Sequence, residues 1–232
     1  SNDMVKKAQN KLQSREKIIL FPNWIDFEKF SFKEVPDKIK NKYFYYKKIF
    51  KKKIILMYSG SMNQKQNFDL IIDCISYYQN NSEIMWIISG EGPSKKDFIK
   101  KVKKFKNVKI YNLQPDYFFN YWLKLADIHL LPQRKGISNS VLPSKLIAIL
   151  ASGKPVIACS DRDSELGNLV SKAGISIESF ELNEFIKGLD KLINNKNLRD
   201  ELGRNGFKLS KELFDKKLIF ENLKNEIEKI IN

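Results

Sequence analysis

Short apolar segments that alternate with amphipathic ones constrain the fold of this chain most strongly. We predict strands at residues 54–58, 84–88, 108–111, 128–131, 156–159 and 175–177, with helices in most of the intervals. Strands that alternate with helices through short connections form a parallel sheet covered on both faces. Because crossovers between parallel strands are right-handed, the sequence predicts an α/β fold with a doubly wound parallel sheet. Further helices are expected at 182–193, 198–213 and 217–231.

One of these units, residues 141–160, also predicts an anion site. Pro143 suits the first turn of a helix, where its missing N–H group costs nothing, and Gly153 suits the end of that helix. The start of the helix presents free N–H groups and the positive end of the helix dipole, with Lys145 in the same turn. A phosphate or diphosphate would be stabilised there. The spacing also fits an ordinary helix–strand unit in which Lys145 is a solvated surface lysine.

Glycines follow several of the predicted strands. In an open parallel sheet the ligand binds beyond the carboxyl ends of the strands. Gly60 and Gly90 lie at two of these ends, and Gly136 lies in the long loop after the fourth strand. Glycine allows close approach of the backbone to a ligand, although ordinary turns also use it. None of these segments matches GxGxxG, so a nicotinamide or flavin site is not expected.

The charge of the chain favours an anionic partner. Its 232 residues carry a formal net charge of +15, which suits nucleotides, nucleic acid or an anionic membrane. The lysines are spread along the chain and no RNA-binding motif accompanies them. Residues 31–50, rich in lysine and aromatic side chains, fit either a partly exposed linker or a helix packed on a neighbour.

The two cysteines and the single histidine are predicted to be structural. Cys74 and Cys159 lie in apolar patterns, as expected of reduced, buried side chains in a cytosolic protein. Their spacing supports no metal site, and no signal peptide or membrane-spanning segment is evident. His129 lies within an apolar strand, where a structural role is favoured over a catalytic one.

Six short motifs follow one another along the chain. They are NWID at 23–26, YSG at 58–60 followed by Lys65, SGEGP at 89–93, ADIHLLP at 126–132, PSKL at 143–146 and ASGKPVIA at 151–158. In this order and spacing the chain resembles the C-terminal, donor-binding half of retaining GT-B glycosyltransferases of group 1 (family 4). Within that family it is most similar to transferases of colanic-acid and capsular polysaccharide biosynthesis.

The resemblance implies a division of the chain. Residues 1–30 would be the tail of an N-terminal domain and a linker, and residues 31–215 a Rossmann-like domain that binds a nucleotide-sugar. Residues 216–232 would form a helix that packs on the N-terminal, acceptor-binding domain, which looks absent.

The resemblance also implies roles for individual residues. Lys65 and Lys145 would be the catalytic cations that neutralise the diphosphate leaving group as the glycosidic bond breaks. The substrate-binding residues would be Gly60, Ser61, Gly90, Glu91, Asn112, Leu113, Ser140, Val141, Leu142, Ser144 and Glu165. No metal and no cofactor are expected, because lysines and helix N–H groups would do the work of a metal. The donor's own phosphate would receive the acceptor proton.

The chain departs from the family at two positions. Ser140 and Ala148 stand where members usually carry two glutamates, eight positions apart. Glu165 is a candidate substitute, and it equally fits an acid favoured by the dipole at a helix N-terminus.

The function expected from this resemblance is transfer of a sugar from a nucleoside-diphosphate sugar, UDP-linked, to a lipid-linked or polysaccharide acceptor with retention of configuration. The fragment alone is expected to be inactive, because the reacting groups meet only in the cleft between two domains. We expect a cytoplasmic protein with peripheral contact to the inner face of the cell membrane and no nucleic-acid partner. The alternatives are an epimerase-like GT-B enzyme and a non-enzymatic basic module that binds RNA or an anionic membrane. Steep salt dependence without nucleotide preference would favour the module.

Overall fold

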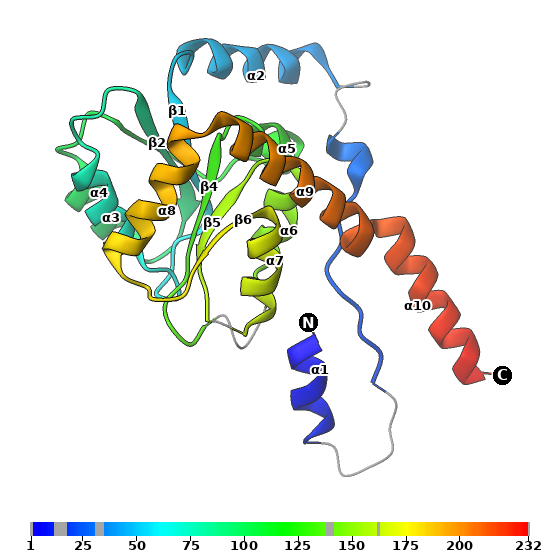
Figure 1. The fold of residues 1–232 in the computed structure, drawn as a ribbon. Coiled ribbons are helices and arrows are strands. Elements are labelled where there is room, and N and C mark those ends of the chain that lie inside the picture. The colour runs from blue at the N-terminus through cyan, green and yellow to red at the C-terminus, as the bar shows by residue number, and fades with distance from the viewer. Residues whose placement is uncertain (1, 12–17, 31–34, 138–141, 162, 232) are drawn as a thin grey trace.

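The computed structural model of this chain describes residues 2–11, 18–30, 35–137, 142–161 and 163–231. At its centre is a six-stranded, all-parallel sheet in the order β3-β2-β1-β4-β5-β6 (Figure 1). The strands are β1 Ile54–Ser61, β2 Ile84–Glu91, β3 Val108–Tyr111, β4 Ile128–Pro132, β5 Val156–Cys159 and β6 Gly174–Ile177. The predicted doubly wound sheet is confirmed, because the strand order reverses between β1 and β4.

Helices cover both faces of the sheet. They are α1 Asn2–Gln9, α2 Asp37–Ile49, α3 Phe68–Tyr77, α4 Lys95–Val102, α5 Asp116–Leu123, α6 Ser144–Ala151, α7 Glu165–Ala173, α8 Leu182–Asn194, α9 Lys196–Phe214 and α10 Lys216–Ile231, with a short 3₁₀ helix at Phe27–Phe30. Side chains alternate along each strand, so Leu56 packs toward α3, α4 and α8 whereas Met57 packs toward α2 and α5. A third cluster joins β4 and β5 to α6 and α7.

The unit at residues 141–160 folds as its sequence predicts over its described part. Pro143 directly precedes α6, and Ser152 ends it. Gly153 then adopts a φ of +72°, a left-handed conformation that glycine reaches without strain. Ser140 and Val141 lie outside the described residues.

The first two strands are longer than predicted, because the glycines at their ends remain in the sheet. Gly60 pairs with Gly90 in the β1–β2 ladder. A Cβ on Gly90 would lie 2.2 Å from the carbonyl oxygen of Gly60, which no side chain tolerates. Glycine at this edge therefore serves the close approach of two strands rather than a turn after them.

Within the segment at residues 31–50, Asp37–Ile49 forms helix α2. α2 packs its inner side on α5, with the Tyr46 ring 5.0 Å from the Trp122 ring. Cys74 and Cys159 are fully buried and not disulfide-bonded, as predicted. In the described part of the chain no helix has the length and apolarity needed to span a membrane.

Candidate active site

Lys145 in the first turn of α6 reaches over the carboxyl end of β1. Its Nζ donates to the hydroxyl of Tyr58 at 2.9 Å and to Oε1 of Gln66 at 3.4 Å. The same Nζ lies 4.6 Å from the centre of the Tyr58 ring. Burial lowers the pKa of Lys145 from 10.5 to about 8. Among the described residues no carboxylate forms an ion pair with it, so the ammonium group is held by neutral partners alone.

Gly60 provides the open backbone beside this ammonium group. A Cβ at Gly60 would lie 3.3 Å from both Cε and Nζ of Lys145, so the lysine runs along a stretch of bare main chain. The hydroxyl of Tyr58 donates to the carbonyl oxygen of Ser61, and this fixes the ring that carries the lysine. Strand β1 and helix α6 thus bring a cation, a helix N-terminus and an uncovered backbone together, a combination that suits an anion.

Lys65 lies at the same edge of the sheet, in the loop between β1 and α3. Its neighbour Gln66 is the residue that contacts Lys145, and the Lys65 carbonyl oxygen accepts from the N–H of Arg134 at 3.0 Å. The Lys65 side chain is exposed and has no hydrogen bond or ion pair with the described residues. The two lysines therefore share one edge, with Lys65 free to turn toward a ligand.

A second polar cluster forms at the ends of β2 and β3. Lys95, in the first turn of α4, donates to Glu91 at 2.6 Å and to Oδ1 of Asn112 at 2.8 Å. The buried hydroxyl of Ser89 donates to the carbonyl oxygen of Asn112. These bonds hold the backbone around Asn112 and the exposed Leu113 at the edge where a nucleotide is expected.

The other predicted substrate contacts occupy different places. Ser61 is exposed and its hydroxyl accepts from Asn63 at 3.1 Å, while Ser144 is exposed at the start of α6. Ala148 is partly buried against the cluster on α2 and α5, which accounts for a small side chain there.

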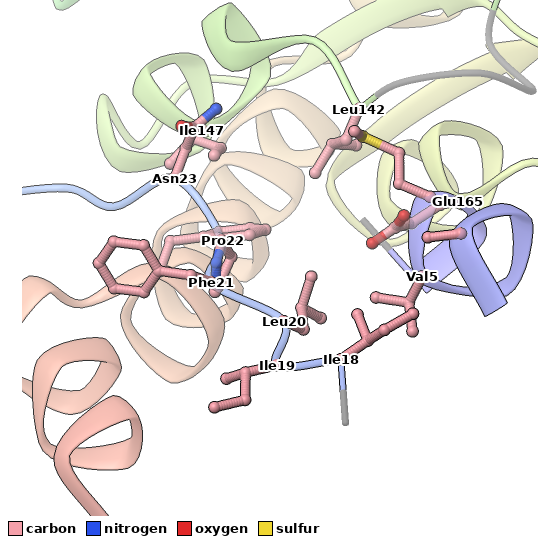
Figure 2. A pocket seen from close by; sticks show the side chains of 13 residues that line it. Val5, Ile18, Ile19, Leu20, Phe21, Pro22, Asn23, Leu142, Ile147 and Glu165 are labelled. Atoms are coloured by element: carbon pink, nitrogen blue, oxygen red, sulfur yellow. The ribbon is translucent and has the colours of Figure 1, made fainter. Parts of the chain in front are cut away.

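Glu165 lies at the start of α7, where Ser164 caps the helix by accepting from the N–H of Gly167. There it lines a cavity of about 560 Å³ together with α1, residues 18–23, Leu142, Ile147 and Phe214. Figure 2 shows its carboxylate between Leu142 and Val5. Its Oε2 atom is buried without a hydrogen-bond partner among the described residues.

Sequence reasoning missed three side chains of the site. Tyr58 lies in an apolar strand and reads as a core residue, and Gln66 lies in an unremarkable polar loop. Lys95 was one of many lysines, although its place in the first helical turn after a glycine-bearing strand end was a usable signal. His129 is structural as predicted: burial lowers its pKa to about 3, and its Nε2 lies 3.1 Å from the carbonyl oxygen of Leu123.

Among the described residues there is no cluster of three or more His, Cys, Asp or Glu side chains that could hold a metal ion. What the edge offers to a ligand is a set of ammonium groups and backbone N–H groups, which suit a phosphate ester.

Comparison with known proteins shows the family to which this chain belongs. The family of group 1 glycosyl transferases matches residues 40–209, well over half of the chain. The chain belongs to this family. The putative colanic acid biosynthesis glycosyl transferase WcaI of Escherichia coli K12 is 29% identical over 172 residues, covering 73% of this chain and 41% of WcaI.

Solved structures of GT-B glycosyltransferases share the fold. HepE of Anabaena, in complex with UDP and glucose, superposes with a TM-score of 0.69 at 14% identity over 91% of this chain and 57% of HepE. WaaG, a glycosyltransferase of lipopolysaccharide biosynthesis, gives a TM-score of 0.69 at 16% identity over 89% of this chain and 55% of WaaG. The chain thus spans less than half of WcaI and little more than half of these two structures.

Proposed function

We propose that this chain is the donor-binding half of a retaining glycosyltransferase that uses a UDP-sugar. The observation that carries the proposal is the Lys145 ammonium group, held over the open backbone at Gly60 by two neutral acceptors. A partly buried cation without a carboxylate partner is stabilised by an incoming anion, which restores the protonation that burial disfavours. The complex of HepE with UDP supports the choice of nucleotide.

In this proposal the lysines act on the leaving group. Negative charge develops on the diphosphate as the bond to the sugar breaks, so a fixed cation stabilises the transition state more than the bound donor. Lys145 would contact the diphosphate from its position over β1, whereas the exposed side chain of Lys65 would turn toward the same diphosphate. The donor's phosphate then takes the acceptor proton, and this half needs no protein base.

A second, N-terminal domain would bind the acceptor. α10 carries exposed apolar side chains, including Leu218, Ile227 and Ile230. Beside its start the exposed rings of Phe21, Trp24 and Phe220 pack on one another with centres 5.1–5.6 Å apart. We propose that an N-terminal domain covers this surface. WcaI is described as a colanic acid transferase, which supports a polysaccharide or lipid-linked acceptor.

Isothermal titration calorimetry with UDP, GDP and ADP at 0.1 M and 0.5 M NaCl tests the proposal. We expect UDP to bind with a clear preference that persists at the higher salt. Lys145→Met should weaken binding of UDP at least tenfold, and the exposed Lys208→Met on α9 should leave it unchanged. Weak binding that ignores the base and disappears with salt would contradict the proposal.

A further inference from the structure

Helix α2 and residues 50–53, which we call the α2 surface, concentrate positive charge. Between residues 37 and 53 there is a single acidic residue, Asp37. The lysines of the same stretch are Lys38, Lys40, Lys42, Lys47, Lys48, Lys51, Lys52 and Lys53. A surface of this charge density attracts polyanions and repels a second copy of itself.

The lysines of the α2 surface differ from those of the other surface helices. On α8, α9 and α10, lysines pair with glutamates one turn away, as in Lys187–Glu184 at 2.7 Å and Lys224–Glu228 at 3.7 Å. On the described part of the α2 surface the ion pair is Lys40–Asp37, at a loose 3.9 Å. The charge of the α2 surface is therefore left almost uncompensated.

The outer side of α2 also carries exposed apolar side chains. Phe44, Tyr45 and Ile49 are 58%, 59% and 47% exposed, whereas Tyr43 and Phe50 are buried against the body of the domain. Phe44 and Lys48 lie one turn apart, as do Tyr45 and Ile49, so two neighbouring rows of the exposed side combine apolar and basic side chains. Rings and an aliphatic chain flanked by lysines are the composition of a helix that lies in the interface of an anionic bilayer.

The α2 surface lies at the opposite end of the sheet from Lys145, which reaches over the carboxyl end of β1. Figure 1 shows α2 across the end of the sheet where the strands begin, with β1 leading away from it. Lys154 lies near this end: burial lowers its pKa most, the charge of Asp127 opposes that shift, and the charge of Lys47 adds to it. Lys154 lines a pocket of about 220 Å³ with Asp127, Gly153, Pro155, Arg199, Asp200 and Arg204.

We propose that the α2 surface binds an anionic lipid bilayer. The lysines would lie near headgroup phosphates, and Phe44, Tyr45 and Ile49 would enter the interface. RNA is the weaker fit, because the α2 surface has no arginine and the aliphatic side chain of Ile49 cannot stack on a base. This proposal is independent of the donor site, which would face away from the bilayer.

Co-sedimentation with vesicles tests the proposal on the whole chain. The vesicles contain phosphatidylcholine alone or with 30% phosphatidylglycerol, at 0.1 M and 0.5 M NaCl. Lys38→Gln/Lys48→Gln/Lys51→Gln should weaken partition onto anionic vesicles about 100-fold, at about fivefold per lysine near the surface. The matched control Lys187→Gln/Lys208→Gln/Lys224→Gln removes the same charge from α8, α9 and α10 and should have little effect.

A second pair of variants tests the apolar contribution. Phe44→Ser/Ile49→Ser should lower the partition about tenfold. Leu218→Ser/Ile227→Ser makes the same change on α10 and should leave partition unchanged. Thermal unfolding followed by circular dichroism establishes that each variant folds. This check does not depend on UDP binding, so it holds even if the proposed function is wrong.

Three results would overturn the proposal. The first is equal binding to neutral and anionic vesicles. The second is an equal loss of vesicle binding in the control variants. Binding would then depend on the net charge of the chain or on α10 and not on the α2 surface. The third is tighter binding to a single-stranded RNA oligonucleotide than to anionic vesicles at 0.1 M salt, which would assign the α2 surface to RNA.

Discussion

Replacing Lys145 with methionine tests whether burial destabilises the charged ammonium group in the candidate site. Methionine keeps much of the length and the apolar stem but removes the charge. Burial takes the pKa of Lys145 from 10.5 to about 8. At about 1.4 kcal/mol per pKa unit, the folded protein gives up about 3 kcal/mol at pH 7 to keep this group charged.

The sign follows from proton binding. The unfolded chain keeps the Lys145 proton up to about pH 10.5, whereas the folded protein releases it near pH 8. Between these values the unfolded state binds more protons, so this group makes the folded protein more stable as the pH rises. The contribution is absent from the variant. We expect the free energy of unfolding of the wild type, relative to Lys145→Met, to rise by about 2 kcal/mol from pH 7.0 to pH 9.5.

Urea unfolding followed by tryptophan fluorescence, at both pH values, measures this difference. Comparison between the two proteins cancels the titration of the other lysines, tyrosines and cysteines. Lys208→Met, at an exposed position on α9, is the control and should show no such change with pH. A difference between wild type and Lys145→Met that is the same at pH 7.0 and pH 9.5 would refute the account of a desolvated ammonium group.

Three further outcomes are expected. Gly90→Ala should destabilise the protein by about 3 kcal/mol or more in urea unfolding, because the new methyl group meets the carbonyl oxygen of Gly60; unchanged stability would contradict the close pairing of the strands. Tyr58→Phe removes the hydroxyl that accepts from Lys145, and should cost about 1–2 kcal/mol in urea unfolding and weaken UDP binding in calorimetry; full retention of both would show that the hydroxyl does not position the lysine. His129 has a pKa of about 3 in the fold against 6.5 outside it, so its contribution to stability is present above pH 6.5 and is lost as the pH falls toward 3. His129→Leu should therefore lose less stability than the wild type between pH 6.5 and pH 4 in urea unfolding, and an equal loss would contradict a buried neutral histidine.

Much of the fold could be predicted because its signals are local. The helix that begins after Pro143 and stops just before Gly153 needs only the geometry of proline and glycine. The six strands appear as apolar runs because both faces of the sheet are covered. The edge expected to receive a ligand follows from the parallel order, and Gly60 and Lys145 both lie at it.

The partners of Lys145 could not be predicted in the same way. Tyr58 is 87 positions away in the chain, and nothing in an apolar strand marks a tyrosine whose hydroxyl faces a lysine. Glu165 shows the converse: its place at a helix start was foreseeable, but the cavity that it lines depends on how α1 and α7 pack. Contacts between distant segments depend on packing, which leaves no periodic trace in the sequence.

Local sequence alone therefore determined the elements, their order and the edge that receives a ligand, since backbone preferences and apolar periodicity act over a few residues. The tertiary structure alone decided that Lys145 is partly buried among neutral partners, which lowers its pKa to about 8. It also decided that Phe44 and Tyr45 of α2 face water, whereas Tyr43 and Tyr46 pack inward. Desolvation is a property of everything packed around a group, and only the complete fold specifies that.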